Sequence, residues 1–154
     1  MNDQLTIKRT DSNDADFNTL IRQLDYELWT IMNEVQATYD QFNKVPDLPT
    51  VIVAYYNNEP VACGCFKKHN DNTVEIKRMF VVPESRGKDV ATTILAELEK
   101  WAKELNYTTA VLETGKRMTP ANQLYKKNGY SITENYGQYI GLEESVCMKK
   151  ELAR

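Results

Sequence analysis

Hydrophobic and polar residues follow two different periods along the chain, and these periods predict strands and helices in turn. Runs rich in β-branched and aromatic residues predict strands at 5–9, 50–56, 60–67, 73–82, 108–114, 130–135 and 145–151. Apolar residues spaced three and four apart predict helices at 17–28, 90–105 and 120–128, and a weaker aromatic-bearing piece at 29–42. Residues 11–14 offer N-cap candidates for the first helix, and Thr119 offers one for the last.

Short turns join the three strands between residues 50 and 82, at Asn57-Asn58 and in the His69–Asn72 stretch, which predicts an antiparallel meander. The strand, helix and strand from 73 to 114 predict a right-handed parallel crossover. The expected fold class is therefore α/β (α+β), with a mixed, mostly antiparallel sheet of six to seven strands and helices on both faces.

Composition narrows the classes of protein that this chain can be. The length of 154 residues predicts a single domain, 1–154. The net charge of −3 predicts that nucleic acid is not a partner. No run of 18 apolar residues occurs, so no membrane span is expected, and the polar N-terminus predicts a cytoplasmic protein.

The three cysteines, Cys63, Cys65 and Cys147, predict reduced, buried packing residues rather than a disulfide framework. A metal site is not expected, because His69 is the only histidine available to join them. A cysteine nucleophile is not expected either, because no histidine other than His69 is available to act as its base.

The junction between the fourth strand and the next helix carries the clearest chemical signal. The loop Arg86-Gly87-Lys88-Asp89 leads into a helix at Val90. Unpaired N–H groups and the positive end of the dipole make a helix N-terminus an anion site. Gly87 lets the backbone come close to a ligand, and the two basic residues add positive charge. The loop therefore predicts phosphate binding.

The order Arg86-Gly87-Lys88-Asp89-Val90-Ala91 resembles motif A of the GNAT superfamily N-acetyltransferases, Q/R-x-x-G-x-G/A after a strand. The segment PANQLYKKNGY, residues 120–130, is similar to a second region of that family. The resemblance covers residue 50 to the C-terminus well and the N-terminal third loosely. It implies an acetyltransferase with acetyl-CoA as co-substrate and a splayed central strand pair.

By this resemblance, acetyl-CoA lies in a V-shaped gap between the fourth and fifth strands. Backbone groups of the fourth strand pair with the pantetheine arm as an added strand would. The cofactor-binding residues expected from the family are Met79, Phe80 and Val81 for the arm, Arg86, Gly87, Lys88, Asp89, Val90, Ala91 and Thr92 for the pyrophosphate, and Asn122 and Tyr125 on the last helix.

Asp89 departs from the motif, because the family usually has glycine there. A carboxylate repels a pyrophosphate, by roughly 1 kcal/mol at 4 Å in water and about 4 kcal/mol at an effective dielectric of 20. Its side chain can also cap the helix through the amides that the pyrophosphate needs. The hypothesis is weakened, not abolished, cofactor binding.

Tyr125 is expected to protonate the leaving CoA thiolate, a role that the family implies and that a phenol of pKa about 10 can fill. Two glutamates compete for the role of general base, Glu75 on the fourth strand and Glu113 near the end of the fifth. The amine would attack the thioester directly, with a backbone N–H at Met79 or Phe80 as oxyanion donor.

The acceptor is expected to be a small-molecule or peptide amine. Its pocket is expected to be lined by Tyr136, Gln138 and Tyr139, with Glu143 and Glu144 nearby to attract a cationic amine. Trp29, Met32, Tyr39 and Phe42 are either core residues or a wall of the acceptor site. The alternative to an enzyme is an acyl-CoA-binding or sensing module of the same fold, which Asp89 favours. A structural protein without a cofactor site and a thiol hydrolase complete the alternatives, and a homodimer is possible.

Overall fold

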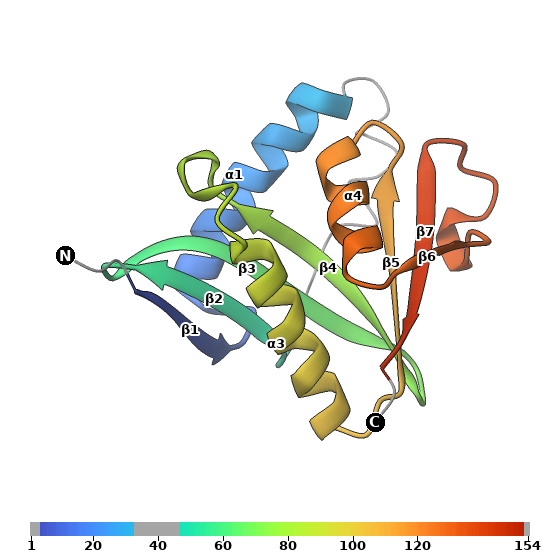
Figure 1. The fold of residues 1–154 in the computed structure, drawn as a ribbon, viewed down its shortest axis with the longest axis horizontal. Coiled ribbons are helices and arrows are strands. Elements are labelled where there is room, and N and C mark those ends of the chain that lie inside the picture. Colours follow the sequence, from blue (N-terminus) through green and yellow to red (C-terminus); the bar gives the residue numbers. More distant parts are fainter. Residues whose placement is uncertain (1–3, 33–46, 153–154) are drawn as a thin grey trace.

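The computed structural model describes residues 4–32 and 47–152 of the chain (Figure 1). Its elements are β1 (Leu5–Thr10), α1 (Ala15–Met32), β2 (Val51–Tyr56), β3 (Glu59–Asn70), β4 (Thr73–Val81), η2 (Pro83–Ser85), α3 (Val90–Glu104), β5 (Thr109–Gly115), α4 (Thr119–Lys127), β6 (Ser131–Thr133), η3 (Gly137–Tyr139) and β7 (Ser145–Glu151). The predicted order of strands and helices is confirmed.

The strands form one seven-stranded sheet in the order β1-β2-β3-β4-β5-β7-β6. Every neighbouring pair is antiparallel except β4 and β5, which the crossover through α3 makes parallel. The predicted mixed, mostly antiparallel sheet is therefore confirmed. The parallel pair lies at the middle of the sheet.

Helices cover both faces of the sheet, as the sequence predicts. Helices α3 and α4 lie on one face and α1 on the other (Figure 1). The larger core packs beneath α3 and holds its buried residues Val90, Ile94, Leu95, Leu98 and Ala102. A second core beneath α1 holds Phe17, Leu20, Leu24, Val51, Val53, Cys63, Cys65 and Phe80. Alternation along each strand sends its apolar residues into both layers.

Several predicted boundaries are wrong for local reasons. His69 lies within β3, which runs to Asn70, so the turn is shorter than expected. Leu105 follows the last residue of α3 and is 48% exposed instead of buried. Thr119 lies inside α4, whose N-cap position is Met118 and has no side-chain cap.

The weak helical piece expected at 29–42 falls mostly outside the described residues. Its first residues, through Met32, continue α1 instead of starting a new helix. Trp29 lies in this last turn with 46% of its surface exposed, so it is not a core residue. Whether the rest of this piece forms a wall of the acceptor site stays a prediction.

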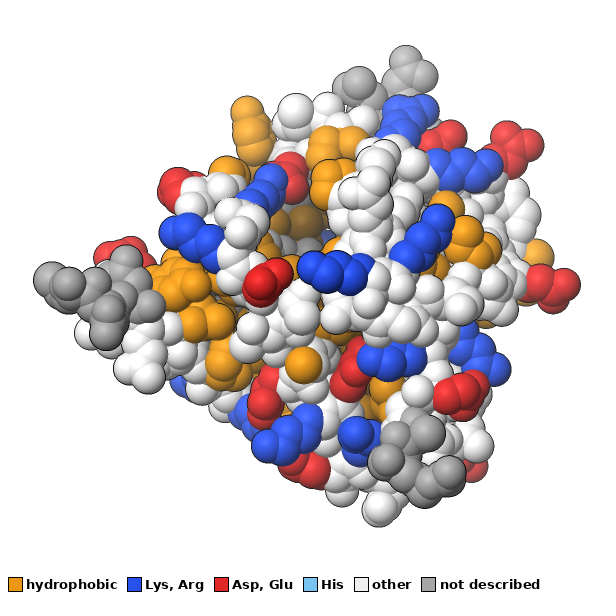
Figure 2. All heavy atoms as spheres, in the orientation of Figure 1, with side chains coloured by type: hydrophobic (Ala, Val, Ile, Leu, Met, Phe, Trp, Pro, Cys, Tyr) orange, Lys and Arg blue, Asp and Glu red, His pale blue; other side chains and the backbone are white. Residues whose placement is uncertain are grey.

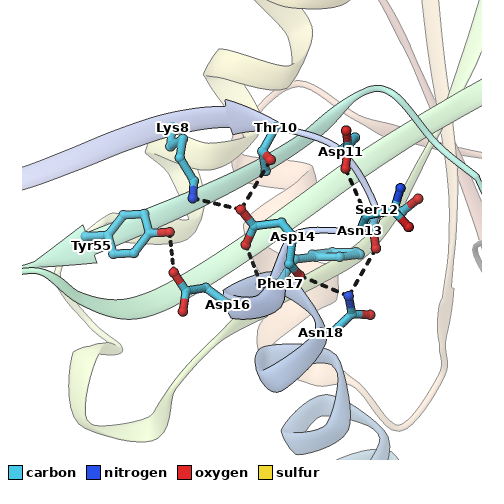
Figure 3. Close-up of polar contacts among 10 residues, drawn as sticks. All are labelled: Lys8, Thr10, Asp11, Ser12, Asn13, Asp14, Asp16, Phe17, Asn18 and Tyr55. Atoms are coloured by element: carbon cyan, nitrogen blue, oxygen red, sulfur yellow. Dashed lines mark hydrogen bonds and ion pairs between the residues drawn. The ribbon is translucent and has the colours of Figure 1, made fainter.

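Asp14 fixes the start of α1 (Figure 3). One carboxylate oxygen accepts the backbone N–H of Phe17 at 2.9 Å, and the other lies 2.7 Å from Lys8 Nζ and accepts the Thr10 hydroxyl at 3.2 Å. These contacts hold the pKa of Asp14 below its usual range against the opposing effect of burial. The predicted N-cap within residues 11–14 is thus confirmed, and it ties α1 to β1.

Gly64 of β3 packs directly beneath α3. A Cβ at this position would lie 2.6 Å from the Met79 sulfur, 2.9 Å from Ile94 Cγ2 and 3.1 Å from Leu98 Cδ1. We expect Gly64→Ala to lower the free energy of unfolding by about 1–3 kcal/mol, because overpacking pushes α3 away from the sheet. Urea unfolding measures this, and a variant as stable as the wild type would contradict the packing described.

Candidate active site

The two central strands separate partway along their length. Strands β4 and β5 pair from Thr73 with Thr109 to Ile76 with Leu112, and both continue beyond the last pair. The arrows of β4 and β5 diverge, with α4 beside β5 (Figure 1). A hollow with apolar side chains at its floor and both basic and acidic side chains around it opens between the β4–α3 loop and α4 (Figure 2). The predicted splayed pair is therefore present.

A β-bulge accompanies the separation. Lys77 pairs with Cys65 and Phe80 with Cys63, so two residues of β4 oppose Gly64 alone. Arg78, one of the two, has a left-handed backbone with φ of 59°. A bulge bends its strand and increases its twist, which turns the end of β4 away from β5. Sequence reasoning missed this bulge, because arginine gives no signal for a left-handed residue in a strand.

The end of β4 presents backbone groups to the gap. Val82 N–H donates to the Val61 carbonyl of β3 at 2.8 Å. Because hydrogen-bonding sides alternate along an antiparallel strand, Val81 faces away from β3 and Phe80 faces toward it. The Val81 carbonyl accepts Arg86 Nε at 2.8 Å. Among the predicted arm-binding residues, Val81 and Met79 are therefore better placed than Phe80.

The loop before α3 is shaped by two left-handed residues, Gly87 at φ 80° and Asp89 at φ 62°. Asp89 occupies the N-cap position, yet its side chain is exposed and makes no capping hydrogen bond. The predicted competition between its carboxylate and a ligand for the helix amides is thus not seen. The first amides of α3, from Val90 to Thr92, keep their lack of partners within the helix.

Arg86 is held by the protein and does not project freely from the loop. Its Nη2 lies 2.6 Å from a Glu27 carboxylate oxygen of α1, and its guanidinium carbon lies 5.7 Å from the Phe80 ring centre. Lys88 Nζ lies 5.7 Å from the centre of the Tyr56 ring. The positive charges expected beside a pyrophosphate are near the loop, and Arg86 also links it to α1.

Asp89 gives a test of this loop. We expect Asp89→Gly to lower the acetyl-CoA dissociation constant about fivefold, since about 1 kcal/mol of repulsion is removed. Asp89→Asn is the matched control, because asparagine tolerates the left-handed backbone but carries no charge. Titration calorimetry should give the same gain for both variants if charge is the cause. A gain for glycine alone would assign it to backbone freedom, and no gain in either would refute the repulsion.

Asn122 and Tyr125 lie three residues apart on α4, so they share one face of this helix, as predicted. Asn122 donates through Nδ2 to the Gly115 carbonyl at 3.2 Å, while its Oδ1 is buried and has no hydrogen-bond partner in the part of the chain that the structure describes. Tyr125 is buried, and its ring meets the Tyr130 ring edge-on at 5.9 Å. Burial, and then the charge of Glu113, raises the pKa of Tyr125. Its hydroxyl therefore stays protonated at neutral pH.

The two candidate bases lie in different surroundings. Glu75 is 2% exposed, accepts the Tyr136 hydroxyl at 2.7 Å and lies 3.8 Å from Lys67 Nζ. Glu113 is only half-buried and accepts the Ser145 hydroxyl at 2.8 Å. Burial raises the pKa of Glu113 to about 7, although the hydrogen bond from Ser145 opposes the shift. A base that titrates near neutral pH is suited to proton transfer.

The residues expected around the acceptor divide into buried and exposed groups. Tyr139 is 1% exposed and its hydroxyl accepts Lys77 Nζ at 3.3 Å, so it supports the site from within. Gln138 and Glu143 are exposed. Glu144 lies 3.1 Å from Arg117 Nε, so its carboxylate already forms an ion pair within the protein. The link between Tyr136 and Glu75 was not foreseen, because 61 residues separate them.

The cysteines are buried and free, as predicted. Burial raises the pKa of Cys63, that of Cys65 to about 12 and that of Cys147 to about 11. All three are therefore thiols at neutral pH, which argues against a cysteine nucleophile. Within residues 4–32 and 47–152, no three metal-ligating side chains cluster and no helix is long and apolar enough to cross a membrane.

Comparison with known proteins agrees with this geometry. The family model described as the acetyltransferase (GNAT) family matches residues 17–130. An uncharacterised N-acetyltransferase of Schizosaccharomyces pombe is 36% identical over 96 residues, which are 60% of this chain and 58% of that protein. The crystal structure of a proposed acyl-CoA N-acyltransferase from Klebsiella pneumoniae superposes with a TM-score of 0.78 at 32% identity, covering 98% of this chain and 99% of the other.

A GNAT acetyltransferase from Elizabethkingia anophelis, solved with acetyl-CoA bound, shares the fold with a TM-score of 0.68 at 20% identity, covering 97% of this chain and 99% of that one. The fold and the splayed strands define an acyl-CoA-dependent N-acyltransferase class. The chain belongs to the GNAT family of acetyltransferases, and acetyl-CoA is the co-substrate of this class. The predicted family, enzyme class and co-substrate are confirmed.

Proposed function

We propose that this protein transfers the acetyl group of acetyl-CoA to a primary amine by direct attack within a ternary complex. The observation that carries the proposal is the gap between β4 and β5. The loop before α3, which would hold the cofactor, and Glu113, whose pKa is raised to about 7, would both face this gap.

The residues present suit acetyl-CoA. The pyrophosphate would lie on the first amides of α3, from Val90 to Thr92, beside Gly87 and Lys88. The pantetheine arm would run along Met79 and Val81 as an added strand. The unpartnered, buried Oδ1 of Asn122 fits an amide donor of that arm, because such an acceptor costs free energy while it lacks one.

Glu113 is the better placed general base. Glu75 accepts a hydrogen bond from Tyr136 and lies among cations, so its lone pairs are engaged. Glu113 would take the proton from the acceptor ammonium, directly or through water, and free its nitrogen lone pair. Glu75 would then position Tyr136 and Lys77.

The reaction itself would proceed by attack on the thioester, collapse of the intermediate and protonation of the leaving thiolate. The amine nitrogen attacks the thioester carbonyl, and the N–H of Met79, which faces away from β3, would stabilise the oxyanion in preference to that of Phe80. Collapse of the tetrahedral intermediate breaks the carbon–sulfur bond. Tyr125, which is protonated at neutral pH because its pKa is raised, then donates its proton to the CoA thiolate. The second proton of the attacking nitrogen, lost as the amide forms, would restore the Tyr125 hydroxyl through water. The products are CoA and an acetamide.

Thiol release from acetyl-CoA across a panel of amines tests the proposal. Release that depends on a primary amine, with the acetylated amine as product, is the expected result. Acetyl-CoA binding without release with any amine would favour the acyl-CoA-binding module. A protein that neither binds acetyl-CoA nor releases thiol would have lost the cofactor site. Cytoplasmic location and a homodimer stay predictions.

A further inference from the structure

Two consecutive cationic side chains, Lys77 and Arg78, project to the α1 face of the sheet where β4 leaves β5. Neighbouring residues of a strand normally point to opposite faces. Here the left-handed backbone of Arg78, at the bulge, directs both to one face. Lys77 Nζ lies 3.3 Å from the Tyr139 hydroxyl, and Arg78 Nη2 lies 2.6 Å from Asp25 Oδ1 of α1.

Both side chains are 5% exposed, which is unusual for cations. Burying a charge is unfavourable unless its donors are paired. Within residues 4–32 and 47–152, the one carboxylate that Arg78 meets belongs to Asp25, which is itself 46% exposed. Arg78 Nε is buried and has no hydrogen-bond partner in the same ranges. An orphaned, charged donor held in a strained backbone is the kind of feature that a ligand completes.

Lys77, the first residue of the cationic pair, lies beside the proposed base. Lys77 and Glu113 are the first residues beyond the last parallel pair, Ile76 with Leu112. Each influences the ionisation of the other, as expected for charges that share one opening. A molecule whose amine reaches Glu113 therefore places its next groups toward Lys77 and Arg78. A guanidinium N–H matches a planar carboxylate in shape as well as in charge.

We infer that the acceptor is an amine that also carries a carboxylate, held by Arg78 with Lys77 while its nitrogen faces Glu113. This inference rests on the proposed acetyl transfer and names its substrate class. Tyr136 and Tyr139 would close the other side of the same opening, because both already contact the groups that surround it.

Matched acceptors test the inference. Each amino acid is compared with the amine that remains when its carboxylate is removed: tyrosine with tyramine, phenylalanine with phenethylamine and leucine with isopentylamine. Rates are taken per free amine. We expect kcat/KM to favour the carboxylated member by about 10- to 100-fold, the range for hydrogen bonds to charged groups. Equal rates, or a preference for the simple amines, would overturn the inference.

Two variants separate a carboxylate anchor from a structural arginine. Arg78→Gln should reduce the preference to within about threefold, because the charged donors are lost. Asp25→Asn removes the ion pair to α1 but keeps the guanidinium, so it should retain the preference. If both variants lose stability and both keep the preference, Arg78 is structural and the inference is wrong. Arg78→Met, which removes every donor and keeps an apolar side chain of similar length, serves the same purpose if the glutamine variant does not fold.

A binding measurement keeps this inference distinct from the proposed reaction. Calorimetry on the CoA-loaded protein compares N-acetyltyrosine with N-acetyltyramine. Tighter binding of the carboxylated ligand in the wild type, lost in Arg78→Gln, supports the site even if no thiol release is ever seen. Equal binding of the two ligands, together with amine-dependent thiol release, would leave acetyl transfer standing and exclude the carboxylate site.

Discussion

Glu113→Gln is expected to lower kcat/KM by about 10²- to 10⁴-fold, the usual loss when a general base is removed. In the wild type, kcat/KM should rise with pH and level off above an apparent pKa of about 7, because the deprotonated carboxylate is the active form. The glutamine variant should lose this rise of kcat/KM near pH 7, the acidic limb of the pH–rate profile. Acetyl-CoA affinity should change little, since the loop before α3 is untouched.

The same substitution should change stability in the opposite direction. The folded-state pKa of Glu113, about 7, lies above the ordinary value near 4.3. The stabilising contribution of its proton is therefore complete below about pH 4 and is lost as the pH rises through 7. Glu113→Gln should consequently unfold at a higher temperature than the wild type at pH 8, with a smaller difference at pH 5.

Glu75→Gln is the matched control for the choice of base. It replaces the other candidate, and it should destabilise the fold because Tyr136 and two lysines lose their charged partner. Its activity should fall, yet the limb near pH 7 should remain. A profile in which Glu75→Gln abolishes the limb and Glu113→Gln keeps it would assign the base to Glu75.

Tyr125→Phe is expected to lower kcat by about 10²-fold or more while acetyl-CoA binding stays nearly unchanged, because a proton donor acts in the breakdown step. The hydroxyl forms no hydrogen bond with any residue of the described ranges, so its removal should cost little stability. The measurement is kcat from thiol release, together with the dissociation constant from calorimetry.

Tyr130→Phe controls for the aromatic environment of that site. Tyr130 meets Tyr125 edge-on, and its hydroxyl donates to Glu99 at 2.8 Å. Losing this charged hydrogen bond should cost about 1.5–3 kcal/mol of stability but little activity. Full activity in Tyr125→Phe would remove Tyr125 from the mechanism. An equal loss of kcat in both variants would point to packing instead of proton transfer.

Local patterns account for what the sequence could predict. Period-two and period-3.6 runs identified every strand and the three α-helices of the described residues, though not the short η2 and η3 turns, and the Arg86–Ala91 motif located the loop before α3. Two helix ends were predicted wrongly by one or more residues: Thr119 lies inside α4, and Leu105 lies beyond α3. Capping by Asp89 failed because its left-handed backbone directs the carboxylate outward.

The rest of the site depends on contacts between distant residues. Glu75 and Glu113 are equivalent in sequence, and only the approach of Tyr136 and Ser145 distinguishes them. The bulge at Arg78 has no sequence signature, because it arises from pairing with β3 opposite Gly64. The buried position of Arg78 beside Asp25 could not be read from the chain for the same reason.

The most direct test of acetyl transfer in a ternary complex is mass spectrometry of the whole reaction. The protein is mixed with acetyl-CoA, first alone and then with a primary amine that it accepts, and both protein and small molecules are weighed. The account predicts an unmodified protein in both cases and, only with amine, equal amounts of CoA and acetylated amine. A protein that gains one acetyl group without amine, or CoA formed with free acetate alone, would contradict it.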